Sequence, residues 1–134
     1  MKRLKSLMIL AAVAFLASCF FVLHAQQGAP TRNVVMKQDL SGLPGREGVV
    51  AKVEFAPGAK ETKHTHPGDV FGYVQEGSIT LYVEGQPTAT VKAGEAFFVP
   101  AGKVHWGENT GTTPVKTVAT FVVEKGKPLA SPAP

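Results

Sequence analysis

Short runs in which apolar and polar residues alternate, separated by turn-forming residues, organise most of this chain. In residues 48–55 and 78–83 every second side chain is apolar, which is the period of a strand with one buried face. Further β-branched or aromatic runs recur between Gly, Pro and Asn, and no segment keeps a helical period. The expected strands are residues 33–37, 48–55, 71–75, 78–83, 88–92, 96–99, 104–109 and 115–123. Strands at this spacing predict an all-β sandwich or barrel.

The first 25 residues differ from this pattern and are expected to be a signal peptide. Cations at positions 2, 3 and 5 precede the apolar residues 7–23, and Leu23-His24-Ala25 is an acceptable cleavage site. The protein is therefore expected to be exported, and to be periplasmic or secreted. Two alternatives stay open. The 17 residues 7–23 could remain as an uncleaved membrane anchor, or the protein could be an envelope lipoprotein lipidated at Cys19, because Leu16-Ala17-Ser18-Cys19 resembles a lipobox.

The two segments that flank the predicted strands set the domain boundaries, and the net charge limits the classes of partner. Residues 26–32 and 124–134 are polar or rich in Pro and Ala, so both are expected to be flexible, which leaves residues 33–123 as one small domain. Beyond residue 25 the chain has 11 Lys and Arg against 10 Asp and Glu, a net charge of +1. These cations are scattered, whereas a nucleic-acid surface needs them clustered, so no nucleic-acid partner is expected. Cys19 is the single cysteine, so the domain has no disulfide and no thiolate ligand.

Three of the four histidines form the pattern that carries most chemistry. His64 and His66 are separated by one residue, so on a strand both project to the same side, about 7 Å apart. His105 follows in a later expected strand, and His24 lies in the predicted signal segment. Isolated histidines of this kind are often surface or core residues. Two on one strand and a third on its neighbour can instead converge on one metal ion.

The residues around these histidines resemble the two motifs of the cupin superfamily. The first motif is matched by Gly58, five residues, His64-Thr65-His66 and a run to Gly77. The second is matched by Gly94, five residues, Pro100-Ala101-Gly102, two residues, His105, three residues and Asn109. The resemblance implies a single jelly-roll (cupin) β-barrel over residues 33–123. It also implies a divalent metal ion bound by His64, His66 and His105.

One position departs from the family pattern. The first motif usually supplies a glutamate ligand where this chain has Val70. Asp69 is adjacent, but a shift of one residue on a strand turns the side chain to the opposite face unless a bulge intervenes. Three neutral imidazoles leave a divalent ion its full charge and up to three open positions, which favours anionic or bidentate oxygen ligands. Imidazole ligands suit Fe, Zn, Ni, Mn or Cu and do not select among them.

The sequence therefore predicts an exported metal-binding protein, with two functions open. It is a metal-dependent enzyme, dioxygenase-like or isomerase/lyase-like, acting on a small oxygenated molecule, or it is a non-catalytic module that binds a metal or small ligand. Phe71, Tyr73 and Phe97 are candidate cavity contacts, whereas Trp106 is expected on the opposite face from its neighbour His105. A homodimer is expected, with residues 33–37 as an edge strand. Membrane contact is expected only through the signal segment or a lipid anchor.

Overall fold

Ten strands and no helix make up residues 28–134, the part of the chain that the computed structural model describes. The predicted signal segment, with Cys19 and the anchor alternatives, lies outside these residues. None of the described residues belongs to a helix that could cross a membrane. The strands are β1 (Thr31–Asp39), β2 (Arg46–Phe55), β3 (His64–Thr65), β4 (Gly68–Glu76), β5 (Ser78–Val83), β6 (Ala89–Lys92), β7 (Ala96–Val99), β8 (His105–Glu108), β9 (Val115–Glu124) and β10 (Ser131–Pro132).

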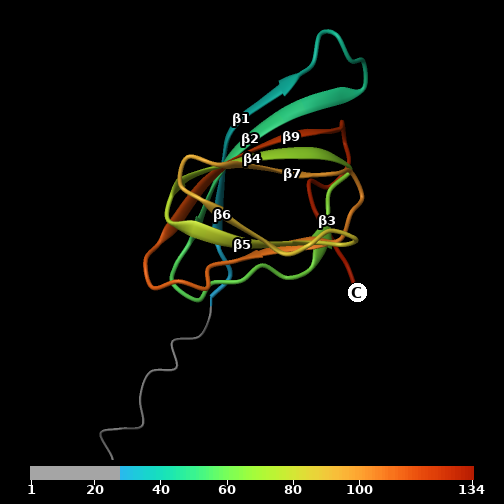
Figure 1. Ribbon diagram of the computed structural model, residues 1–134. Helices are drawn as coiled ribbons and strands as arrows, with labels where there is room; N and C mark the ends of the chain where they lie inside the picture. Colours follow the sequence, from blue (N-terminus) through green and yellow to red (C-terminus); the bar gives the residue numbers. More distant parts are fainter. Residues whose placement is uncertain (1–27) are drawn as a thin grey trace, which may run out of the picture.

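The strands form two antiparallel sheets that face each other (Figure 1). One has the order β1-β2-β9-β4-β7 and the other the order β10-β3-β8-β5-β6. This double sheet confirms the predicted all-β, jelly-roll class. The hairpin of β1 and the start of β2 extends away from the rest of the barrel (Figure 1), and all nine residues of β1 are exposed.

Alternation along the two longest strands builds the core. β2 and β9 pair over ten residues, from Arg46 opposite Glu124 to Phe55 opposite Val115. In β9 every odd-numbered residue is buried, and in β2 the buried residues are those at 47, 49, 51, 53 and 55. The buried apolar side chains form two clusters, and Phe97 packs against both. The sheets are therefore held together by the residues that the two-residue period marks as inward.

Gly77 makes the tight bend between β4 and β5. Its φ is 77°, in the region that favours glycine. A Cβ here would lie 2.6 Å from the carbonyl oxygen of Pro114, so the close approach of the chain also requires glycine. This bend keeps β4 and β5 in different sheets, with the inward faces of both towards one cavity.

Two short strands were not expected, and one of them corrects the predicted tail. The prediction that residues 124–134 are flexible is wrong for β10, because Ser131 pairs with Thr65 and Pro132 with His64 of β3. The side chain of Leu129 packs against the core. The Pro- and Ala-rich composition of this segment has no two-residue alternation that would predict a strand. Main-chain pairing with β3 and the packing of Leu129 nevertheless fix the segment against the barrel. At the other end β1 begins at Thr31, inside the range 26–32 that was also predicted to be flexible.

Candidate metal centre

The two sheets bring the three predicted histidines together inside the barrel. His64 begins β3, His66 follows its end, and His105 begins β8, where it lies directly opposite His64. All three are buried, with 4–7% of their surface exposed. Their ring centroids are 4.3–4.9 Å apart. One nitrogen from each ring lies within 4.8 Å of the other two.

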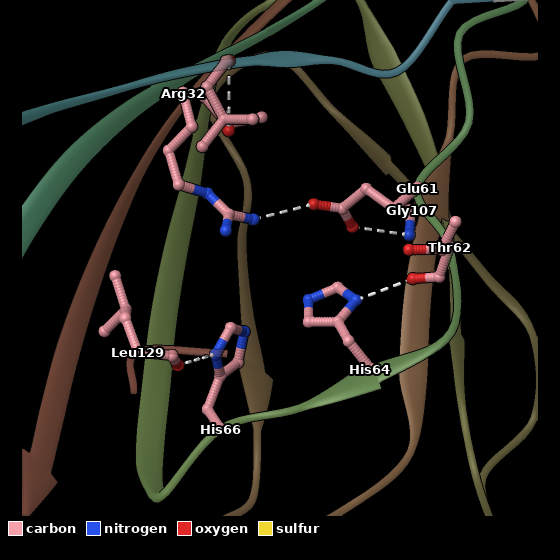
Figure 2. A network of polar contacts seen from close by, with 9 residues as sticks. Arg32, Glu61, Thr62, His64, His66, Gly107 and Leu129 are labelled. Atoms are coloured by element: carbon pink, nitrogen blue, oxygen red, sulfur yellow. Dashed lines mark hydrogen bonds and ion pairs between the residues drawn. The ribbon is translucent and has the colours of Figure 1, made fainter. Parts of the chain in front are cut away.

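Each imidazole is oriented by a main-chain carbonyl on the side away from the cluster. The Nδ1–H groups donate to the carbonyl oxygens of Thr62 at 2.8 Å, Leu129 at 2.6 Å and Lys103 at 3.0 Å, for His64, His66 and His105 respectively. Figure 2 shows the first two of these bonds. A carbonyl oxygen only accepts, so each Nδ1 carries the hydrogen and each neutral ring keeps a lone pair on Nε2.

This donor set fits a divalent cation. Among the described residues, Nε2 of His64 is buried without a hydrogen-bond partner, an arrangement that is costly unless something else binds there. A hydrogen bond from the non-ligating nitrogen to a carbonyl is the usual way in which proteins orient a metal-binding histidine. Metal–imidazole bonds of about 2.0–2.1 Å place ligand nitrogens about 3–3.5 Å apart. The three nitrogens, all within 4.8 Å of one another, lie close to that spacing.

Burial also keeps two of the rings in the form that binds metal. Loss of solvent lowers the pKa of His66 from 6.5 to about 4, and the neighbouring His105 and His64 add to that effect, against the opposing hydrogen bond to Leu129. Burial is likewise the main cause that lowers the pKa of His105. Both rings are therefore neutral near pH 7, so an incoming cation displaces no proton from them.

Hydrogen bonds between loops help to fix the positions of these rings. The Gly102 amide donates to the His66 carbonyl at 3.0 Å, which joins the turn before β8 to the histidine segment. Asn109 is buried, and its amide group donates to the carbonyls of Phe55, Ala56 and Thr113 at 2.8–3.1 Å. Its own side-chain oxygen accepts from the Gly111 amide. The expected structural role of Asn109, to satisfy loop main-chain groups, is confirmed.

The histidines line a small, mostly apolar cavity. Its volume is about 40 Å³, and a single water needs about 10–15 Å³ by the same measure. Half of the sixteen lining residues are valine, leucine, isoleucine or phenylalanine from both sheets, and Phe97 is among them, as expected. The cavity therefore has room for an ion with a ligand of only a few heavy atoms.

The prediction that Phe71 and Tyr73 contact this cavity is wrong. Both are about half exposed, on the outer face of β4, where Phe71 packs on Phe98. The inward position between them is Gly72, and a Cβ added there would lie 2.0 Å from Phe97 Cζ. The ring of Phe97 thus occupies the space above Gly72 that an inward side chain of β4 would fill. Trp106 faces outward as expected, stacked on Tyr82 with centroids 4.6 Å apart.

Sequence comparison identifies the family. A cupin domain profile matches residues 51–123, which is more than half of the chain. This chain belongs to the cupin family. Both of its histidine motifs and all three clustered histidines lie inside the matched region.

Several cupins resemble this chain over most of its length. It is 33% identical over 109 residues to the tetracenomycin polyketide synthase protein TcmJ of Streptomyces glaucescens, covering 81% of this chain and 70% of TcmJ. It is 30% identical over 118 residues to oxalate oxidase 2 of Hordeum vulgare, covering 80% of this chain but 53% of that protein. This cupin therefore spans about half the length of the oxalate oxidase. A Klebsiella pneumoniae structure with a double-stranded β-helix domain shares the fold, with a TM-score of 0.66, 22% identity and coverage of 84% and 90% of the two chains.

The departure from the cupin motif holds in three dimensions. Val70 is buried and lines the cavity, where the family's usual glutamate would supply a fourth ligand. Asp69 does not replace it, because its Oδ1 accepts the Ala101 amide at 3.0 Å and it is not part of the histidine cluster. The cluster of metal-binding residue types in the described part of the chain is thus three histidines with no carboxylate.

Two charged residues beside the histidines were not predicted. Arg32 and Glu61 both line the cavity, and Arg32 Nη2 lies 3.1 Å from Glu61 Oε1 (Figure 2). Arg32 fell in the segment expected to be flexible, and Glu61 precedes the first motif histidine in a loop without periodicity. The register of β1 on β2 would have indicated Arg32, because it lies opposite the inward-facing Val53.

Proposed function

We propose that this cupin binds one divalent metal ion through His64, His66 and His105 and is an enzyme that acts on a small oxygenated molecule there. The observation that carries the proposal is the shared orientation of the three imidazoles, with each Nδ1–H bonded to a carbonyl and each Nε2 left for an ion. When bound, the ion supplies Lewis acidity and positions for oxygen ligands. Dioxygenase-like or isomerase/lyase-like chemistry suits such a centre.

The surrounding residues favour a small anionic ligand. All three ligands are neutral and Val70 adds no charge, so the ion keeps its full positive charge towards the cavity. The apolar wall around it lowers the local dielectric, which strengthens the attraction of the ion for an oxygen anion. The small cavity limits that ligand to a few heavy atoms. The similarity to a protein named oxalate oxidase, whose name indicates a small dicarboxylate, agrees with this ligand class.

One observation favours the second candidate, a binding module without turnover. Glu61 is the single carboxylate that lines the cavity among the described residues, and both of its oxygens have partners. Arg32 engages one, and the Gly107 amide donates to the other at 2.8 Å. Both oxygens of this carboxylate are thus engaged by the protein itself and not by a ligand in the cavity.

The two functions are separated by loading the protein with iron, manganese, nickel, zinc or copper in turn. Oxygen consumption and substrate loss are then followed across diketones, phenols and hydroxy acids, with the metal-free protein and His66→Ala as controls. Turnover that needs both the metal and His66 supports the enzyme. Stoichiometric metal binding with uniform inactivity supports the binding module, and failure to bind any metal contradicts both.

Export and assembly form part of the same proposal. The positively charged start and apolar run of residues 1–25 support export with cleavage after Ala25, so mass spectrometry of protein from the native cell envelope should find Gln26 as the first residue. The edge strand β1, with half-exposed Val34, Val35 and Met36, supports a homodimer paired through this edge. Light scattering that finds a monomer at micromolar concentration would contradict the dimer.

A further inference from the structure

The entrance to the histidine cavity carries one ion pair. Arg32, Glu61 and His64 line both the inner cavity and a wider outer pocket, which is also lined by Pro30, Ala130 and Pro132. The ion pair therefore lies where a ligand passes from the outer pocket towards the histidines. Among the described residues that line the inner cavity, Arg32 and Glu61 are the only Lys, Arg, Asp or Glu.

The two partners of this ion pair are held unequally. Glu61 is fixed by the main chain, because its Oε2 accepts the Gly107 amide at 2.8 Å, and its side chain is 14% exposed. Arg32 is 30% exposed and makes one hydrogen bond to the described residues, from Nη2 to Glu61 Oε1. A guanidinium has five N–H donors in a rigid planar fork. Most of the donors of Arg32 are thus available for another acceptor.

The pairing of β1 with β2 places the Arg32 side chain on the face of the sheet that lines the histidine cavity. Residues directly opposite each other in an antiparallel pair project to the same face. Arg32 lies opposite Val53, which is buried and lines the cavity, so the guanidinium extends over the inner face of the sheet. In Figure 2 it lies above His66, with Nη2 directed at Glu61.

We propose that Arg32 is the specificity-determining residue of this site and binds the carboxylate of a small 2-hydroxy or 2-oxo acid whose other oxygen faces the histidines. The proposal rests on the proposed function, because the second oxygen needs a metal ion to bind. A carboxylate accepts two parallel N–H bonds from a guanidinium, a geometry that a neutral amide of the same size does not match. Glu61 keeps the guanidinium at the entrance when no ligand is present.

The test compares glycolate with glycolamide, which have the same size but differ in charge. Both are titrated by visible spectroscopy into the cobalt-loaded protein, where ligand binding at the ion changes the cobalt spectrum. Arg32→Gln is expected to weaken glycolate binding about 10- to 100-fold, the loss typical of a charge-assisted hydrogen bond, and to leave glycolamide binding and cobalt loading unchanged. Arg32→Lys keeps the charge without the fork and is expected to recover only part of the affinity.

A matched control separates this contact from general electrostatics. Lys52→Gln removes the same charge from β2, at an exposed position, and is expected to bind glycolate as the wild type does. Equal loss of glycolate affinity in Lys52→Gln and Arg32→Gln would overturn the proposal, as would unchanged affinity in Arg32→Gln. In both cases the cobalt loading still supports the metal site. A wild-type protein that does not bind cobalt would overturn the metal site and this proposal together.

Discussion

The C-terminal segment contributes directly to the metal centre, so its removal should weaken metal binding. Leu129 supplies the carbonyl that accepts the Nδ1–H of His66, and β10 pairs with the strand that carries His64. The Ala133 amide also donates to the Lys63 carbonyl at 3.0 Å. Deleting residues 128–134 leaves the three histidines in the chain but takes away these main-chain contacts.

The size of the effect follows from the contacts that are lost. Loss of the hydrogen bond that orients a metal-binding histidine typically costs 10- to 100-fold in metal affinity, or about 1.4–2.7 kcal/mol. The side chain of Leu129 is partly buried, and its removal should cost about 1–2 kcal/mol of folding free energy. Domains commonly have about 5–15 kcal/mol of stability, so the shortened protein should still fold.

Competition titration of zinc against a chromogenic chelator at pH 7 measures the change. Two matched variants separate the carbonyl from its surroundings. Leu129→Ala keeps the carbonyl, so it should change zinc affinity less than threefold while lowering the midpoint of thermal unfolding. Deletion of residues 131–134 removes β10 but keeps Leu129 and its carbonyl. Wild-type zinc affinity in the variant that lacks residues 128–134 would refute the role assigned to the Leu129 carbonyl.

Three further predictions follow from buried contacts. Because the pKa of His66 is about 4 in the folded metal-free protein and 6.5 when exposed, only the unfolded state gains a proton between these values. Stability should therefore fall by about 3 kcal/mol as the pH drops from 6.5 to 4, and flat urea midpoints over that range would contradict this. Asn109→Ala removes the side chain's bonds to three carbonyls and to the Gly111 amide, although the Ala56 carbonyl still accepts the Ala59 amide, and should cost about 3 kcal/mol in urea unfolding; a loss below about 1 kcal/mol would argue against it. Gly72→Ala should push the Phe97 ring away and cost about 1–3 kcal/mol, and the double variant with Phe97→Ala should be less destabilised than additivity predicts.

The sequence predicted the strands and the histidines because both depend on local spacing. The two-residue period located β2 and β5 closely, an apolar and aromatic run located β7, and β1 and β4 proved longer at both ends. His64 and His66 were recognisable because their spacing places both rings on one side of a strand. The second motif then linked His105 to them, although it is far away in the chain.

Residues that act through long-range register or the main chain left no such signal. The Leu129 carbonyl is 63 residues from His66, and any residue type could supply it. Arg32 faces the cavity only because β1 pairs with β2 in one register. Phe71 and Tyr73 were wrongly placed because aromatic side chains in a barrel are expected inside. The inward positions of β4 instead belong to Val70, Gly72 and Val74, with Phe97 covering the glycine.

A crystal structure of the zinc-loaded protein, with anomalous data at the zinc edge, tests the central claim most directly. One peak per chain is expected, about 2.0–2.2 Å from Nε2 of each of His64, His66 and His105. The Nδ1 atoms should keep their bonds to the carbonyls of Thr62, Leu129 and Lys103. A peak bound by fewer than three of these rings, or by an Nδ1 atom, would contradict the account.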